Sequence, residues 1–244
     1  MTENTKYAFT SETLDIGKGL ILKRIVALKD FGDVKKGDLG GWLESEENLS
    51  PLGDSWVYEE AKVAENAKVY GDARVSGNAK VYKNAEVCGR AKVYGDARVS
   101  GNTKVYENGE VYNRAMVWGN VKVYGDSRVS GLAKVSGYST VYGNALVTDY
   151  AGVSGYVEVY GDAQVSGRAY LYADAKVASN EDYIMFKNNW SSGRVFTWTK
   201  SNDMWLVGCF YGTGEELIEK AYQDSEESGR KYELYVNLVK ELQK

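Results

Sequence analysis

The sequence predicts a mainly β protein whose centre is a solenoid of short strands, with a cap at its N-terminal end and a small α+β module at its C-terminal end. Three observations predict this fold: a six-residue repeat runs through the middle of the chain, the 244 residues include 27 glycines but 1 proline, and the repeat is absent from both ends. A fixed period points to stacked structural units rather than to a single folded layer.

The repeat is defined by an aliphatic residue at every sixth position. Valine recurs in this register from Val57 to Val177, with Leu171 as the exception, which gives 21 positions without an insertion or deletion. A small residue such as Ala67 stands two positions earlier, and Gly-Asp or Gly-Asn often follows, as at Gly71. The valine and its two neighbours form a short strand with the valine inward. Glycine followed by Asn or Asp tolerates a sharp corner. Because one unit cannot bury its own valine, the units must stack.

Two coil lengths are compatible with this period. The block AKVYGDARVSGN occurs at 67 and again at 91, a spacing of 24 that fits a two-sided coil of 12 residues. The similar block VEVYGDAQVSGR begins at 157, and its distance of 66 from 91 is not a multiple of 12. We therefore favour three units per coil, seven triangular coils over residues 55–180 and a length of about 34 Å, with the two-sided coil as the alternative.

The outward positions beside each valine carry a distinctive pattern. The position before the valine is mostly Lys or Arg, and the position after it is often Tyr or Ser. With an 18-residue coil, one face stacks tyrosines, interrupted by Cys88. Such residues suit exposed strands and stabilise neighbouring coils by stacking. Alternatively, the face binds an acidic protein surface, a nucleotide or single-stranded nucleic acid. The residues expected to contact a partner are Tyr70, Tyr106, Tyr124, Tyr142, Tyr160, Lys68, Lys104 and Lys122.

Residues 1–54 lack the period, and we expect them to form an N-terminal β cap. Solenoid ends need covering because open coils and strand edges aggregate. Residues 19–28 are typical of a strand pair or a bent strand, and residues 36–43 of turns around a buried Trp42.

Residues 181–244 are expected to form a three-strand meander followed by two helices. Apolar segments at 183–186, 194–199 and 204–211 predict the strands. Thr213 and Glu216 form a capping box that opens a helix ending near Asp224, and residues 232–242 have the spacing of a second amphipathic helix. Large aromatics suit the core of such a module, but Trp and Arg are also enriched at binding sites. The candidate partner- or ligand-binding residues are Trp190, Arg194, Trp198, Trp205 and Tyr211.

The composition excludes several functions. The chain contains no histidine, so Ser-His-Asp catalysis and His-ligated zinc are excluded. Two cysteines without a CxxC spacing do not make a zinc site. We predict no catalytic residue, no metal and no cofactor. The net charge of -4 argues against nonspecific binding of nucleic acid or anionic membranes. Without an apolar leader or a long apolar segment, we expect a cytoplasmic protein.

The six-residue pattern resembles the hexapeptide repeat of left-handed β-helix proteins, which implies a left-handed parallel β-helix. Many members are acyltransferases with a His at a coil corner, which this chain lacks. The segments at 30–42, 188–194 and 208–216 are also similar to hexapeptide-repeat proteins of bacteria and of phage or prophage accessory regions, often labelled as transferases or polymer-forming proteins. Related proteins are trimers, so the resemblance implies a homo-oligomer, a dimer or a trimer.

These observations favour a non-enzymatic binding or scaffold protein with a protein partner. The resemblance to phage proteins suggests an inhibitor of a host defence system in the bacterial cytoplasm. A protein that binds or sequesters a nucleotide-type ligand and an atypical acyltransferase without the usual His are the two alternatives.

Overall fold

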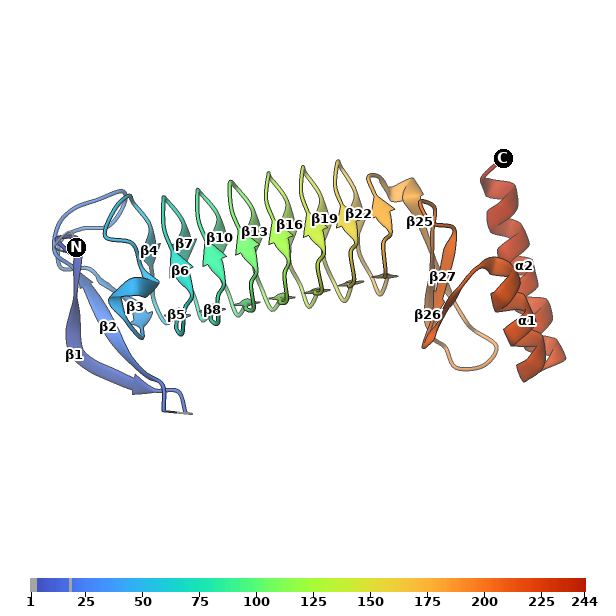
Figure 1. Ribbon diagram of the computed structural model, residues 1–244, viewed down its shortest axis with the longest axis horizontal. Helices are drawn as coiled ribbons and strands as arrows, with labels where there is room; N and C mark the ends of the chain where they lie inside the picture. The colour runs from blue at the N-terminus through green and yellow to red at the C-terminus, as the bar shows by residue number, and fades with distance from the viewer. Residues whose placement is uncertain (1–3, 18) are drawn as a thin grey trace.

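The computed structural model describes residues 4–17 and 19–244. Figure 1 shows a rod of parallel coils with a hairpin at its N-terminal end and a sheet with two helices at its C-terminal end. The predicted mainly β, parallel β-helix fold with a small C-terminal α+β module is confirmed.

The coils have three sides, which we call A, B and C, and each two-residue strand is one rung. Side A contains β3 (Leu39–Leu43), β5 (Lys62–Val63), β8 (Lys80–Val81), β11 (Arg98–Val99), β14 (Met116–Val117), β17 (Lys134–Val135), β20 (Gly152–Val153) and β23 (Tyr170–Leu171). Side B contains β4 (Trp56–Val57), β7 (Arg74–Val75), β10 (Lys92–Val93), β13 (Glu110–Val111), β16 (Arg128–Val129), β19 (Leu146–Val147) and β22 (Gln164–Val165). Side C contains β6 (Lys68–Val69), β9 (Glu86–Val87), β12 (Lys104–Val105), β15 (Lys122–Val123), β18 (Thr140–Val141), β21 (Glu158–Val159) and β24 (Lys176–Val177).

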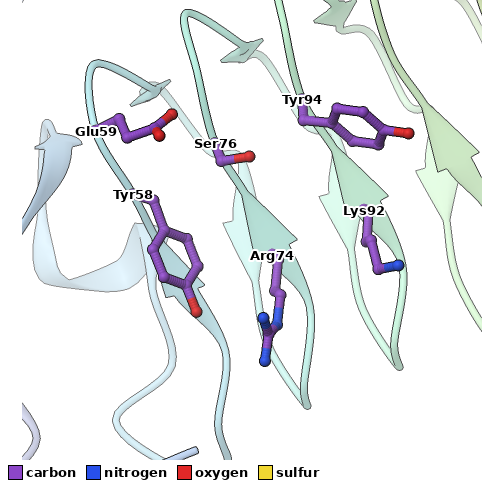
Figure 2. Close-up of a pocket in the computed structure, with 6 residues that line it drawn as sticks. All are labelled: Tyr58, Glu59, Arg74, Ser76, Lys92 and Tyr94. Atoms are coloured by element: carbon purple, nitrogen blue, oxygen red, sulfur yellow. The ribbon is translucent and has the colours of Figure 1, made fainter. Parts of the chain in front are cut away.

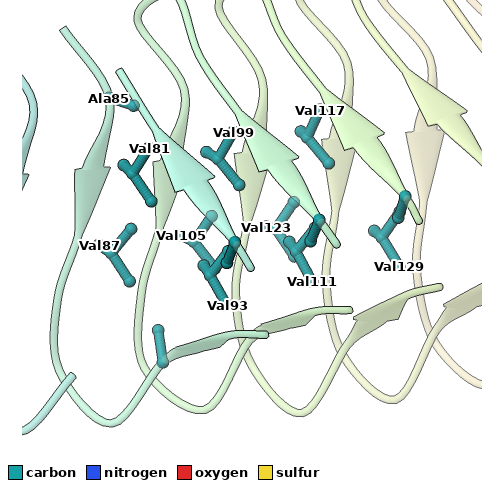
Figure 3. Packing of buried hydrophobic residues seen from close by; sticks show 14 of the residues in the cluster. Val81, Ala85, Val87, Val93, Val99, Val105, Val111, Val117, Val123 and Val129 are labelled. Carbon is teal, nitrogen blue, oxygen red and sulfur yellow. The ribbon is translucent and has the colours of Figure 1, made fainter. Parts of the chain in front are cut away.

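Strand pairing decides the length of the coil. Val93 pairs in parallel with Val75 on one side and with Val111 on the other, so each rung lies on a rung 18 residues away. The three-sided coil is confirmed and the 12-residue alternative is wrong. The repeat valines and the small residues before them fill the interior (Figure 3), where Val81, Val99 and Val117 form one inward row.

The corners are held by left-handed backbone and by side-chain ladders. Gly101 has a φ of 77°, and a Cβ there would lie 2.7 Å from backbone atoms of Gly119, so the stacked corner needs glycine. Along the edge between sides A and C, successive amides bond to one another from rung to rung. This asparagine ladder joins Asn66, Asn84, Asn102 and Asn120, at 3.1, 2.9 and 2.9 Å.

The coils begin earlier than the period of the sequence indicates. β3 pairs in parallel with β5, and Leu49 bridges to Val69, so residues expected to lie in the cap form an additional coil. Leu43 and Leu49 keep the six-residue spacing, but Val57 follows Leu49 by eight positions. The longer corner between Leu49 and Val57 moves these residues out of register with the later repeats. The ladder therefore contains about one coil more than the predicted seven.

A hairpin covers the first edge of side A. β1 (Tyr7–Asp15) pairs antiparallel with β2 (Ile21–Ala27), which pairs antiparallel with β3. β2 corresponds to the strand expected at 19–28, whereas the sequence pattern did not indicate β1. Trp42 is buried as expected, although it lies in a strand, and its indole donates to Glu60 at 2.9 Å. A short 3-10 helix (Glu46–Asn48) follows β3.

The C-terminal module contains four strands rather than the three expected. A 3-10 helix (Asn180–Asp182) leads into β25 (Tyr183–Lys187), followed by β26 (Val195–Thr199), β27 (Met204–Val207) and β28 (Phe210–Gly212). Gly208 has a φ of 63° and turns the chain, so the segment expected as one strand at 204–211 becomes a hairpin. The two helices are α1 (Gly214–Asp224), capped by Thr213, and α2 (Glu226–Leu242).

This module covers the last coil of the solenoid. The backbone N–H of Tyr170 donates to Thr197 at 3.2 Å, and that of Lys176 donates to Ser201 at 2.7 Å. Tyr183 donates its hydroxyl to the carbonyl of Gln164 at 2.8 Å. These bonds satisfy polar backbone groups that an open edge would expose. Within residues 4–17 and 19–244, neither helix has the length and apolarity needed to cross a membrane.

Candidate functional site

The solenoid sides are the main candidate surfaces. In the described part of the chain, no three His, Cys, Asp or Glu side chains lie together as they would around a metal ion. On each rung the residues before and after the inward valine point outward, so each side carries two rows of exposed or half-buried side chains.

Side C holds the predicted tyrosine face, and its rings stack on one another. Tyr106, Tyr124, Tyr142 and Tyr160 form a continuous ladder with centroid distances of 4.7, 5.2 and 5.1 Å and interplanar angles of 4–12°. Tyr70 stands apart from this ladder because Cys88 occupies the next rung. The inner rings have both faces covered by neighbouring rings, so this ladder presents mainly ring edges to a partner.

Carboxylates on side C offset part of its positive charge. Lys104 pairs with Glu86 at 3.1 Å, and the hydroxyl of Tyr70 donates to the same carboxylate at 3.0 Å. Tyr142 donates to Glu158 at 3.2 Å, and burial together with this bond raises the pKa of Tyr142 to about 12. The other two lysines expected to contact a partner, Lys68 and Lys122, are exposed.

The candidate residues of the C-terminal module are separated by the fold. Trp198 and Trp205 are 2% and 1% exposed and belong to the core between the sheet and the helices. Trp190 packs against the same core, with its ring centroid 5.1 Å from that of Tyr232. Arg194 is exposed, so it does not share one surface with the tryptophans.

Tyr211 lines a cleft between the last rung of side A and the C-terminal sheet. The cleft measures about 450 Å³, and the ring of Tyr211 meets Tyr172 edge to face at 5.3 Å. Tyr170, Leu206 and Cys209 also line it. Its lining combines tyrosines with apolar side chains, and no charged residue of the described chain lines it.

Two further cavities lie where an aromatic ladder lacks one ring. On side B, Ser76 stands between Tyr58 and Tyr94, and on side A, Ser100 stands between Tyr82 and Trp118; we call these positions gap B and gap A. Each serine belongs to an Arg-Val-Ser sequence, at 74–76 and 98–100, within the duplicated block. The cavities measure about 330 Å³ at gap B and 210 Å³ at gap A.

A loop of the N-terminal cap neutralises gap B. Figure 2 shows Arg74 beneath Ser76, between Tyr58 and Lys92. Arg74 pairs with Asp33 at 2.9 Å, and the hydroxyl of Tyr58 donates to the same carboxylate at 2.8 Å. The bond from Tyr58 and the charge of Arg74 hold the pKa of Asp33 below its usual value. Lys92 pairs with Glu110 at 3.0 Å. Both cations of gap B are therefore paired within the protein.

Gap A opens into a groove whose cations have no ion-pair partner in the described part of the chain. The groove measures about 440 Å³ and runs from the hairpin turn at Ile16 and Leu20 across Lys62 and Lys80 to Arg98. These three cations lie on consecutive rungs of side A, and no ion pair within the described residues involves them.

Electrostatic repulsion and burial both act in this groove. Burial lowers the pKa of Lys62, the charge of Glu60 opposes that shift, and the neighbouring Lys80 adds to it. Glu60 itself accepts from Arg24 and Trp42, at 2.9 Å each. An anion in the groove would relieve the repulsion between the cations.

The six-residue pattern does not distinguish this side, because Lys or Arg occupies the position before the valine on rungs of all three sides. Sorting the outward residues by an 18-residue period separates them. Sides B and C carry Glu110, Glu86 and Glu158 before the valine, whereas side A carries no carboxylate at that position from β5 to β23. The hairpin that covers the groove had no such pattern.

Comparisons with known proteins agree with this architecture. The sequence model of the YdcK β-solenoid repeat family matches residues 67–83 and 91–107. Both matched segments contain Arg-Val-Ser. A protein named uncharacterized acetyltransferase YdcK, from Escherichia coli strain K12, is 33% identical over 70 residues. The matched region is 28% of this chain and 22% of that relative. The repeat, the parallel coils and these similarities identify the chain as a β-helix repeat protein.

Proposed function

We propose that this chain is a non-enzymatic binding protein that holds an anionic partner on side A of its solenoid. The observation that carries the proposal is the row of Lys62, Lys80 and Arg98 on consecutive rungs, without a carboxylate partner in the described residues and beside the hairpin turn. Sides B and C have the same kind of cations but pair several of them internally.

Rigidity favours such a role. Each rung is fixed by parallel pairing to both neighbours, so the backbone positions that carry the cations are held about 4.8 Å apart before a partner arrives. A preorganised charged surface loses little conformational freedom on binding and steers an oppositely charged partner toward it. Because the whole chain has a net charge of -4, anionic partners should bind at this positive groove rather than nonspecifically over the rest of the surface.

The test compares two triple variants that remove equal charge from equivalent positions. Lys62→Gln, Lys80→Gln and Arg98→Gln change side A, and Lys68→Gln, Lys104→Gln and Lys122→Gln change side C. Each variant and the unchanged protein are purified from the source cells and weighed by native mass spectrometry. We expect bound mass on the unchanged protein and on the side C variant, and its loss from the side A variant.

Two results would contradict this assignment. Equal bound mass on all three proteins would exclude both lysine sets, and selective loss from the side C variant would place the partner on the tyrosine face. The size of the bound mass separates a small ligand from a protein partner. Multiples of 27.0 kDa in the same spectra give the number of copies, for which we propose a dimer or a trimer.

The phage-like opening and closing segments suggest a more specific role. We propose that, in an infected bacterium, the bound partner belongs to a host defence system and is inhibited by being held on the solenoid. Expression of the unchanged protein should then restore phage growth in a defended host, and the side A triple variant should not. Equal protection by both proteins would contradict this role.

An acyltransferase without the usual His is the second candidate, because the E. coli relative carries an acetyltransferase name. This chain would need a general base other than His, which Asp or Glu side chains can supply. Incubation with acetyl-CoA and an amine panel, followed by detection of free CoA thiol, tests it. Release of thiol above the rate without protein would support the transferase and contradict a purely binding role.

A further inference from the structure

We infer that gap A is a receptor for one flat nucleobase, and that the cation row beside it receives the phosphates of a nucleoside 5′-polyphosphate. This inference rests on the proposed binding function of side A and names the class of ligand that the groove takes. It concerns a site distinct from the C-terminal residues and from the tyrosine face that the sequence suggested for ligand or partner binding.

The aromatic ladders give the dimensions of the gap. Where neighbouring rungs both carry tyrosine, the rings lie nearly parallel with centroids 4.7–5.2 Å apart, as on side C and between Tyr94 and Tyr112. Tyr82 and Trp118 occupy the same outward position two rungs apart. With one ring missing between them, the space is about two ladder steps, or roughly 10 Å. One inserted flat ring would complete the ladder.

The side chains around the gap suit an aromatic ring. Ser100, 7% exposed, forms a small floor beneath it, and Trp118, 40% exposed, is one side of the gap. The half-buried Met116 adds apolar lining. Bases stack on aromatic side chains in a way that tolerates different bases, because every base has a π face.

Three cations lie on the hairpin side of the gap, whereas on the other side the first cation at this position is Lys134, two rungs from Arg98. Arg98 is on the same rung as Ser100, Lys80 is one rung nearer the hairpin, and Lys62 is two rungs nearer. On the opposite side, the equivalent residue is the uncharged Met116. A nucleoside 5′-polyphosphate has the same layout, with a flat ring at one end and closely spaced anionic groups at the other. Guanidinium groups bind phosphate through paired hydrogen bonds.

An acidic peptide fits this layout less well. In an extended peptide, side chains on one face recur about every 7 Å, which does not match rungs about 4.8 Å apart. The gap on side B provides an internal contrast, because its Arg74 already pairs with Asp33 and its Tyr58 is bonded to the same carboxylate. Gap A therefore has both the ring space and a cation, Arg98, that is unpaired among residues 4–17 and 19–244, whereas gap B has only the space.

The experiment fills the gap from the protein side. Ser100→Phe supplies the missing ring at a position where other rungs carry tyrosine, so it should leave the coils intact. Ser76→Phe makes the same change in gap B and is the matched control. Isothermal titration calorimetry measures the affinity of each protein for five probes. These are ATP, adenosine, inorganic triphosphate, a ten-residue polyglutamate and a ten-nucleotide oligodeoxyadenylate.

We expect ATP to bind at least about tenfold more tightly than adenosine or inorganic triphosphate, because only ATP uses both the gap and the cations. Ser100→Phe should weaken the binding of ATP by about tenfold or more and leave the affinity for inorganic triphosphate unchanged. Ser76→Phe should change neither affinity. A circular dichroism spectrum that matches that of the unchanged protein shows that each variant is folded. As a second test, Trp118→Ala removes a ring that borders the gap and should also weaken the binding of ATP.

Several results would overturn the inference. Equal affinity for ATP and inorganic triphosphate, with no effect of Ser100→Phe, would leave a simple anion groove and retain the proposed function. Tightest binding of the oligonucleotide or of polyglutamate would replace the free nucleotide by a polymer. Binding of none of these probes also refutes the nucleotide site. The binding function itself then fails only if native mass spectrometry shows no bound mass that depends on side A.

Discussion

At the scale of single residues, burial and hydrogen bonding oppose each other at Lys6. Its side chain is 1% exposed, and its ammonium group donates to the carbonyls of Ser55 and Ser50, at 2.6 and 3.2 Å. The same group lies 4.8 Å from the ring centre of Phe31. Burial nevertheless dominates and lowers the pKa of Lys6 to about 8, although the charge of Asp54 opposes this shift. The cap therefore holds a cation whose charge is costly near neutral pH.

This shift predicts a stability that rises with pH. In the unfolded chain, Lys6 keeps its proton up to its ordinary pKa of 10.5, whereas in the folded chain it releases the proton near 8. Between these values the unfolded state binds more protons, so the free energy of unfolding should rise by up to about 1.4 kcal/mol per pH unit. Below pH 8 both states are protonated and the contribution to the slope disappears.

Urea unfolding of the unchanged protein and of Lys6→Met at pH 7.0, 8.0, 9.0 and 9.5 measures this effect. Lys6→Met should be less stable at every pH because the carbonyls of Ser50 and Ser55 lose their donor, and it should lack the additional slope above pH 8. Parallel pH profiles for the two proteins would show that Lys6 does not titrate in this range.

At the scale of elements, the two-residue strands depend on contacts between coils. A single rung has only one inward valine, and its stability comes from pairing with rungs above and below it. Side-chain ladders add to this pairing at the corners, where the backbone has left-handed glycines or residues such as Glu107. The asparagine ladder runs from Asn66 to Asn120 and the tyrosine ladder from Tyr106 to Tyr160, so they share one step between coils and otherwise stabilise different coils.

The asparagine ladder gives a prediction with an internal control. Asn84 accepts from Asn66 and donates to Asn102, whereas among the described residues the side chain of Asn66 bonds only to Asn84. Each such bond contributes about 0.5–1.5 kcal/mol. Asn84→Ala should therefore cost about 1–2 kcal/mol, roughly twice the cost of Asn66→Ala, in urea unfolding. Equal costs would mean that the exposed amides gain nothing over their bonds to water.

At the scale of the whole molecule, both ends of the rod are covered by non-repeat segments. The hairpin β1–β2 lies against the first rung of side A, and strand β26 lies against the last one, β23. The C-terminal module also has its own core around Phe196, Trp198 and Trp205. Covered ends stop further strands from adding to the solenoid.

This arrangement predicts opposite outcomes for two shortened proteins. Removal of residues 181–244 should expose the edge of the last coil and cause concentration-dependent association. Removal of residues 125–142, which is one full coil, joins Tyr124 to the next coil in register and leaves both ends covered. Light scattering after size-exclusion chromatography should show association only for the first. The same oligomeric state for both would show that the C-terminal module does not protect the edge.

Much of the fold could be predicted because it depends on local chemistry repeated many times. The period of six, the inward valines, the glycine corners and the capping box at Thr213 each act within a few residues, so the pattern of letters contains them. The stacking of Tyr106 on Tyr124 also follows from the period once the coil has three sides. The period did not predict the first coil, because the longer corner after Leu49 moves that coil out of the six-residue register.

The sequence by itself therefore determined the repeat, the core and the helices, and the tertiary structure decided which outward residues are free to bind. Asp33 and Arg74 are far apart in the sequence, yet their ion pair neutralises gap B. The hairpin turn at Ile16 reaches the groove of side A, where Arg98 remains unpaired in the described residues. The physical reason is that charge balance depends on distances between remote segments, and the hexapeptide pattern of inward valines and corner glycines contains no information about those distances.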